Sequence, residues 1–153
     1  MSEKLVHDLT ARLGAMIREL SVKNERRVYV EVAPDDLRQA VRVIFEEMGA
    51  RYATATGMQV QDGFEVLHHF VFDSQRVVVS LRVSTESEEP EFDSITPLIT
   101  GAEFIEREMR DLLGIQFKGH PNPKRLILSD DWPDDVYPLR RGRPWEGKVR
   151  KQV

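Results

Sequence analysis

The sequence of 153 residues contains no cysteine. Without thiols the chain has no disulfide framework, no thiolate metal site and no cysteine-bound iron–sulfur cluster. It also lacks any run approaching the roughly 20 apolar residues that span a bilayer. Its first ten residues have neither the charged start nor the apolar stretch of a signal peptide. Cytoplasmic residence without membrane insertion is therefore the expectation.

Motifs that carry chemistry are absent as well. His68 and His69 are adjacent on an expected strand, so their side chains point to opposite faces and do not share one metal ion. His7 and His120 lie in unrelated segments, and the sequence has no glycine-rich phosphate loop and no nucleophile elbow. We therefore expect no catalytic, cofactor-binding or metal-binding residue in this chain.

Charge is distributed unevenly along the chain, although the net charge is only −4. Residues 118–153 contain nine Lys or Arg against five Asp or Glu, a balance of +4, so the remainder carries −8. A basic tail on an acidic body indicates a segment that lies on a partner, or else a solvated, frayed terminus. A stand-alone nucleic-acid-binding module using this tail is the alternative function, which the acidic body disfavours.

Hydrophobic periodicity predicts an α+β fold. Apolar residues at three- and four-residue spacing predict a helix over residues 4–20, and Pro34 begins a second helix that we expect to end at Gly49. The expected strands are 28–32, 51–60, 64–72 and 76–83, the last two forming an antiparallel hairpin. Gly57 weakens the prediction for the second of them. The order αβαβββ predicts helices on one face of a small, largely antiparallel sheet.

The remainder of the chain has a different character. One further helix is expected over residues 101–113, with Gly114 as its C-cap. Seven of the eight prolines lie beyond residue 89, and proline fixes φ and removes a backbone donor. We therefore expect an α+β domain over residues 1–113 and an extended, irregular segment over 114–153. Irregular chain of that length usually needs a surface to lie on, so this segment is expected to dock on a partner.

The helix at 101–113 carries a second stripe beside its core-facing apolar one. Phe104, Arg107, Glu108 and Asp111 make up this stripe. An aromatic residue among three charges is unusual for a solvated face, and such charges can fix the register of an interface between proteins. The alternative is an ordinary exposed ladder in which Arg107 and Asp111 pair along the helix.

A longer pattern of spaced residues extends over residues 95–141. It comprises Glu106-Arg107-Glu108, Asp111-Leu112, Gly114-Ile115, Phe117, Gly119-His120-Pro121, Arg125, Trp132 and Pro138-Leu139-Arg140. This pattern resembles the signature of the C subunit family of respiratory complex I, the NADH–quinone oxidoreductase. It is similar also to the homologous subunit of energy-converting, membrane-bound nickel–iron hydrogenases.

The chain departs from the complex I pattern at two places. Phe104 stands where complex I members usually have tryptophan, and Arg141-Gly142-Arg143 follows the motif in place of their usual continuation. The run Asp131-Trp132-Pro133 leading to Val136-Tyr137-Pro138-Leu139-Arg140 is closer to the hydrogenase branch. Both branches stay open at this point.

The resemblance implies a cofactor-free, hydrophilic scaffold subunit of an oxidoreductase complex that couples electron transport to ion translocation. Such a subunit is peripheral on the cytoplasmic side of the cell membrane. Its partners are the large subunit, which holds the quinone site or the nickel–iron centre, and the neighbouring iron–sulfur subunits.

By the motif match, the residues implied to be interface or fold-locking residues rather than catalysts are Glu106, Arg107, Glu108, Asp111, His120, Arg125 and Arg140. Together with the spaced aromatic and arginine residues, the match gives a set expected at the partner interface. The set is Phe104, Arg107, Glu108, Asp111, His120, Arg125, Trp132, Arg140, Arg141, Arg143 and Trp145. The arginines of the C-terminal segment, especially Arg140, Arg141 and Arg143, are expected to pair with partner carboxylates through their forked guanidinium groups. On that interpretation, alanine at these arginines leaves the melting temperature of the isolated chain unchanged.

Overall fold

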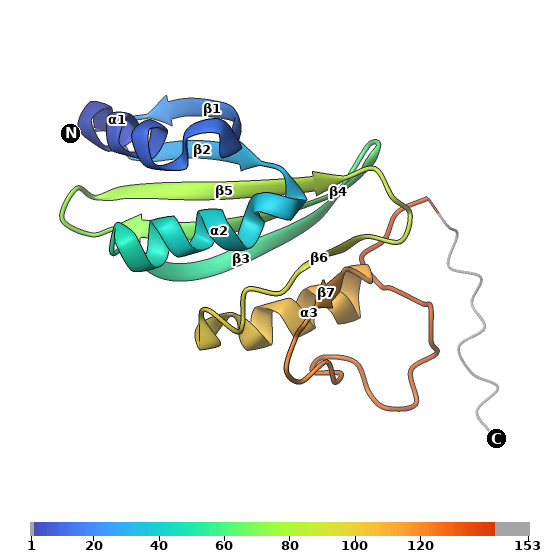
Figure 1. Cartoon of the computed structure of the whole chain (residues 1–153). Helices are drawn as coiled ribbons and strands as arrows, with labels where there is room; N and C mark the ends of the chain where they lie inside the picture. The colour runs from blue at the N-terminus through green and yellow to red at the C-terminus, as the bar shows by residue number, and fades with distance from the viewer. Residues whose placement is uncertain (1, 143–153) are drawn as a thin grey trace, which may run out of the picture.

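The computed structural model describes residues 2–142 (Figure 1). Arg143 and Trp145, two of the residues expected at a partner interface, lie outside the described residues. The helices and strands are α1 (Ser2–Leu13), β1 (Ile17–Asn24), β2 (Arg27–Val32), α2 (Leu37–Arg42), β3 (Arg51–Val60), β4 (Gly63–Phe72), β5 (Val77–Thr85), β6 (Glu91–Asp93), α3 (Glu103–Leu113) and β7 (Gln116–Lys118). Short helical segments flank them at Gly14–Met16, Pro34–Asp36, Val43–Glu47 and Thr100–Ala102.

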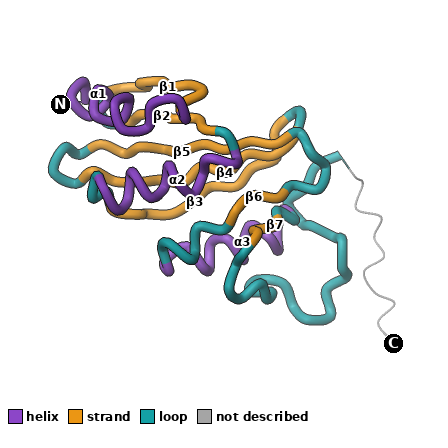
Figure 2. Tube along the Cα trace, in the orientation of Figure 1, coloured by secondary structure: helices purple, strands orange, loops and turns teal. Residues whose placement is uncertain are grey.

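Five strands form one sheet in the order β1-β2-β5-β4-β3. Neighbouring strands run antiparallel except β2 and β5, which are parallel. β6 and β7 pair in parallel as a separate small sheet. Figure 1 shows α1 and α2 over one face of the large sheet and α3 alongside β3. Figure 2 shows that little regular structure follows β7. The expected α+β class, with helices on one face of a largely antiparallel sheet, is confirmed.

The hydrophobic core lies between the sheet and the helices. Alternate residues of β4 face the helices because side chains of a strand point to opposite faces in turn. These buried residues are Phe64, Val66, His68, Phe70 and Phe72. The helices contribute Leu5 and Leu9 from α1, Leu37 and Val41 from α2, and Met109 and Leu113 from α3. The face predicted for this strand is therefore its core face.

The first helix is shorter than the sequence predicted. It ends at Leu13, and Gly14 follows in the left-handed region with φ +52. Ile17 and Leu20, predicted to continue the helix, lie in β1, which forms a hairpin with β2. The register shifts between Ile17 and Glu19, so Ile17 and Leu20 both lie opposite buried valines of β2 although they are three residues apart. This β-bulge reproduces the spacing of a helix, and the true order of elements begins αββα.

The second helix is confirmed between Pro34 and Gly49. Pro34 begins its first turn, where a missing N–H costs nothing. The helix widens to π geometry over Val43–Glu47 before it ends. Gly49 follows with φ +71, a left-handed conformation that glycine adopts without strain.

Gly57 does not interrupt β3, which runs continuously from Arg51 to Val60. The reason for glycine at this position is the close approach of α3. A Cβ added at Gly57 would lie 2.7 Å from Met109 Sδ and 2.9 Å from Met109 Cγ. The absence of a side chain at Gly57 therefore sets how closely α3 packs on the sheet.

Gly57→Val is expected to lower the free energy of unfolding by about 1–3 kcal/mol, because the added atoms overpack the contact with Met109. Chemical denaturation of the purified chain measures this loss. Gly101→Val is the matched control, since an added Cβ at Gly101 meets nothing within 4 Å. Equal losses in the two variants would contradict the role of space at Gly57.

Candidate docking site

The segment after β7 folds back onto α3. We call residues 119–142 the strap. In Figure 1 the strap leaves β7, makes a wide loop beside α3 and returns to the end of that helix. No strap residue is buried, since all are half-buried or exposed. The strap therefore has no apolar core of its own, and its shape depends on polar contacts with α3.

Asp111 makes the most concentrated of these contacts. Its Oδ2 accepts three successive backbone N–H groups, from Leu126 at 2.8 Å, Ile127 at 2.8 Å and Leu128 at 3.1 Å. Burial alone would raise the pKa of Asp111, but the three N–H donors and the nearby charge of Arg110 outweigh it and hold the pKa below its ordinary value. The carboxylate of Asp111 thus binds a turn of the strap as a charged acceptor.

Arg107 holds the adjacent part of the strap. Its Nε donates to the carbonyl oxygen of Lys124 at 2.9 Å and its Nη2 to that of Arg125 at 3.0 Å. Its ion-pair partner is Glu103, at 3.7 Å, rather than Asp111. The exposed Arg107–Asp111 ladder considered from the sequence is therefore wrong, because both side chains are buried and bind the strap backbone.

Glu106 connects α3 to the loop before it and is completely buried. It accepts hydrogen bonds from the hydroxyl of Ser94 at 2.5 Å, the backbone N–H of Ile95 at 2.7 Å and the hydroxyl of Thr96 at 2.8 Å. His120 Nε2, at the start of the strap, lies 3.7 Å from Glu106 Oε2. Burial raises the pKa of Glu106 against the opposing effect of these donors and of His120. Glu106 thus joins the inner side of α3 to the strap.

Arg125 and Trp132 organise the far part of the strap. Arg125 Nη1 donates to the carbonyl oxygens of Ser129 at 2.9 Å, Asp130 at 3.2 Å and Trp132 at 2.7 Å. Trp132 Nε1 donates to the carbonyl oxygen of Val136 at 2.8 Å. These two side chains satisfy carbonyl groups that a loop without secondary structure leaves unpaired.

Arg140 returns the strap to the end of α3. Its Nε donates to the carbonyl oxygen of Leu113 at 2.6 Å. Its guanidinium lies over two aromatic rings, 4.9 Å from the centroid of Phe64 and 4.6 Å from that of Tyr137. Gly114, with φ +70, is the C-cap that was predicted, and an added Cβ there would lie 2.5 Å from the Tyr137 ring. All of these contacts of Arg140 are made within this chain, so its side chain stabilises the fold.

The other expected interface residues are placed as follows. Arg141 exchanges hydrogen bonds with Gln59 at the end of β3. Glu108 is half-buried on α3. Phe104 is 62% exposed, with its ring 5.7 Å from the guanidinium carbon of Arg107. Contact of any of these residues with a partner chain stays a prediction.

Sequence reasoning missed three apolar side chains that the strap leaves in solvent. Leu126 is 40% exposed, Ile127 54% and Leu139 57%. Leu126 and Ile127 follow the residues held by Arg107 and have their own N–H groups held by Asp111. We call Phe104, Leu126 and Ile127 the apolar anchors. The sequence contained a signal for Leu126 and Ile127, because Leu126-Ile127-Leu128 is an apolar run within a polar, proline-rich segment.

The described residues contain no cluster of three or more His, Asp or Glu side chains placed to hold a metal ion. Among the described helices, none has the length and apolar character required to span a membrane.

Comparison with known proteins gives three kinds of match. A family model described as "Respiratory-chain NADH dehydrogenase, 30 Kd subunit" matches residues 30–149. Formate hydrogenlyase subunit 5 of Escherichia coli (strain K12) is 44% identical over 63 residues, which cover 41% of this chain and 11% of that protein. The C subunit of the NADH-quinone oxidoreductase of Mesorhizobium japonicum is 34% identical over 134 residues, which cover 86% of this chain and 63% of that protein.

A solved structure shares the fold. It is a chain in the structure of the membrane-bound sulfane sulfur reductase (MBS), described as an archaeal respiratory membrane complex. The TM-score is 0.78 at 20% sequence identity, and the match covers 90% of this chain and 82% of that chain. The two curated relatives are longer than the present chain, whose matches span 11% and 63% of their lengths.

Asp111→Asn is expected to destabilise the chain by about 2 kcal/mol, because three backbone N–H groups lose a charged acceptor. The local result is faster amide hydrogen exchange at residues 126–128, which NMR measures residue by residue. Asp8→Asn, a change at a half-buried position on α1, is the control and is expected to leave these rates unchanged. Unchanged exchange at 126–128 in Asp111→Asn would show that the carboxylate does not hold the turn.

Arg140→Ala is expected to lower the melting temperature by several degrees, since it removes a charged donor and a stacking partner of two rings. This prediction from the structure replaces the prediction from the sequence, which was that the melting temperature would not change. Thermal unfolding followed by circular dichroism measures it. Arg26→Ala serves as the control because Arg26 is exposed in the β1–β2 turn. A melting temperature equal to that of the unmodified chain would show that Arg140 does not stabilise the fold, as the sequence analysis predicted.

Proposed function

The chain belongs to the family of the respiratory-chain NADH dehydrogenase 30 kDa subunit, and from this premise we propose that it is a hydrophilic scaffold subunit of a membrane-bound redox complex. The complex is of the NADH–quinone oxidoreductase or energy-converting hydrogenase type. The observation that carries the proposal is the family match over residues 30–149, which includes all of α3 and the strap.

The partner is the larger subunit of the same complex, the one that carries the quinone site or the nickel–iron centre. Formate hydrogenlyase subunit 5 supports this choice, because the matched 63 residues occupy only 11% of its length. In that relative the matching segment is covalently joined to a much larger polypeptide, which keeps the two parts together at high effective concentration. The present chain is proposed to meet the counterpart of that larger part, on the cytoplasmic side of the membrane.

The apolar anchors are the proposed centre of the docking surface. Phe104, Leu126 and Ile127 are exposed, while the backbone beneath the two strap anchors is fixed by Arg107 and Asp111. Aromatic and aliphatic side chains that fill partner pockets contribute most of the energy at interfaces. A surface fixed before binding loses little conformational entropy when the partner arrives.

The charged motif residues act in this proposal by positioning the anchors. Arg107 and Asp111 each direct their hydrogen bonds to the strap backbone. Their removal is therefore expected to weaken docking through displacement of Leu126 and Ile127. No observation favours the alternative of a nucleic-acid-binding module, because Arg125 and Arg140 donate to carbonyl groups of this chain.

Affinity capture from detergent-solubilised membranes of the native organism tests the proposal, with metal and flavin analysis of the retained proteins. Recovery of a nickel-containing large subunit would assign the chain to a hydrogenase. Recovery of flavin and NADH-oxidising subunits would assign it to an NADH–quinone oxidoreductase. Recovery of no membrane partner would contradict the proposed function.

Ile127→Ser is expected to reduce recovery of the large subunit about tenfold, the equivalent of losing one buried aliphatic side chain. The melting temperature of the isolated chain should change little, because Ile127 is 54% exposed. Val22→Ser is the matched control, since Val22 is 49% exposed on β1, at the opposite edge of the sheet from β3. Equal recovery with both variants would remove Ile127 from the docking surface.

A further inference from the structure

Two neighbouring side chains of the sheet have buried polar atoms with no hydrogen-bond partner among the described residues. His68 is completely buried on β4, and neither of its ring nitrogens has a hydrogen-bond partner among the described residues. The hydroxyl oxygen of Tyr52 on β3 is also buried and equally unpartnered within the described chain. Buried polar groups in folded proteins are nearly always hydrogen-bonded, so two such groups in one core require an explanation.

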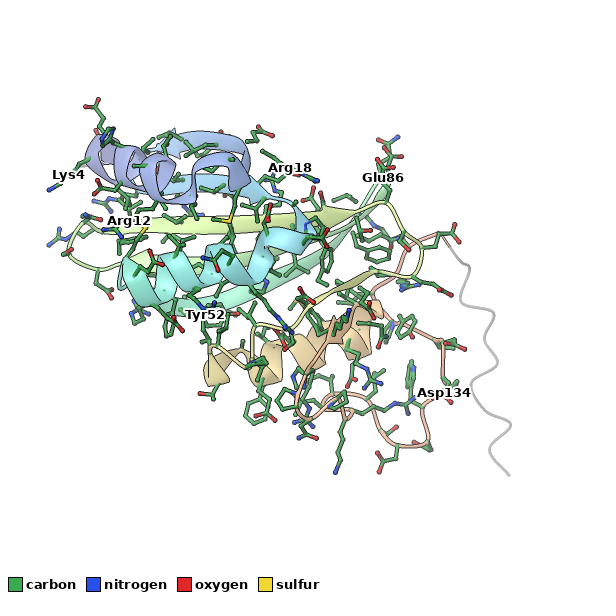
Figure 3. All side chains as sticks on the ribbon, in the orientation of Figure 1. Lys4, Arg12, Arg18, Tyr52, Glu86 and Asp134 are labelled. Atoms are coloured by element: carbon green, nitrogen blue, oxygen red, sulfur yellow. The ribbon has the colours of Figure 1, made fainter. Side chains whose placement is uncertain are left out.

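The two side chains are neighbours on the same face of the sheet. Their ring centroids are 6.3 Å apart and the ring planes are inclined at 41°. The edge of the Tyr52 ring also contacts Phe70, at 5.5 Å between centroids. Figure 3 labels Tyr52 below α2, on β3. The two rings therefore lie next to each other in the layer between the sheet and the helices.

The hydrogen-bonding capacity of this pair matches that of water. Burial lowers the pKa of His68 to about 3, so the ring is neutral near pH 7 and has one N–H donor and one acceptor nitrogen. Burial and the nearby charge of Glu106 raise the pKa of Tyr52, so its hydroxyl remains a donor. A water molecule has two donors and two acceptors, and buried waters typically make about three hydrogen bonds.

We propose that the core holds an ordered internal water that bridges the His68 ring and the Tyr52 hydroxyl. Glu106 is the third partner in this proposal, because its charge acts on the Tyr52 hydroxyl and its Oε1 accepts one N–H, from Ile95, among the described residues. The water joins β3 and β4 to α3, the helix that holds the strap. It is a hydration site within the sheet–helix interface and is independent of the proposed docking function.

NMR of the full-length chain tests the site directly. We expect nuclear Overhauser contacts between the His68 ring protons and a water that exchanges slowly with bulk solvent. We also expect one His68 nitrogen to have a ¹⁵N shift typical of hydrogen-bonded imidazole. His69 is the internal control, since its nitrogens lie 2.8 Å from Ser80 Oγ and 2.9 Å from Thr56 Oγ1. Unbonded ¹⁵N shifts at His68 together with no water contact would overturn the proposal.

Tyr52→Phe removes one partner of the water and keeps the ring. The expected result is loss or weakening of the water contact at His68 and a shift of at least one His68 ¹⁵N resonance toward the unbonded value, with His69 unchanged. A second measurement is the melting temperature of Tyr52→Phe, His68→Phe and the double variant. A shared water predicts that the double variant loses less than the sum of the two single losses. Strict additivity, with an unshifted His68 in Tyr52→Phe, would show that the two groups share no ligand.

Discussion

Asp111 accepts hydrogen bonds from three successive backbone N–H groups of the strap with one carboxylate oxygen, and the form of the strap depends on this contact. No apolar residue of the strap is buried, so the strap has no hydrophobic core of its own. Its backbone polar groups must be paired by side chains of α3, by side chains of the strap itself, or by water. A charged acceptor gives stronger hydrogen bonds than a neutral one, and it fixes the direction of three consecutive peptide groups. Leu126 and Ile127 are exposed as a consequence, because the turn that carries them points its amides inward.

Around α3, charged side chains are buried and apolar side chains are exposed, the reverse of the usual arrangement in a folded protein. Arg107 and Asp111 are buried and serve the backbone, while Phe104 and Ile127 are in solvent. A buried charge costs desolvation, which is offset only by several well-directed partners. Arg107 and Asp111 each have at least two such partners in the strap. The inversion explains why a charged sequence signature accompanies a protein that is proposed to dock through apolar contacts.

The sequence allowed four of the five strands of the large sheet, the second helix and α3 to be predicted because their signals are local. Alternation in β4 and the three- and four-residue spacing in α3 need no knowledge of the rest of the chain. The β-bulge after Ile17 defeated the same method, since it imitates a helical period. The resemblance implied interface or fold-locking roles for Asp111 and Arg140, but their contacts could not be predicted from periodicity, for a different reason. Their partners lie 15 to 27 residues away, and no periodic pattern encodes the chain reversal that brings them together.

α3 connects the sheet to the strap, packing on the sheet through apolar side chains and holding the strap through charged ones. On its inner side Met109 packs against Gly57, where an added Cβ would meet the methionine at 2.7 Å, so the helix sits at a fixed height above the sheet. On its outer side Asp111 and Arg107 hold the strap at hydrogen-bond distances, which tolerate little displacement. A shift of α3 at Gly57 therefore moves the strap turn that carries Leu126 and Ile127. Packing in the core, far from any partner, thereby sets the geometry of the surface proposed to meet one.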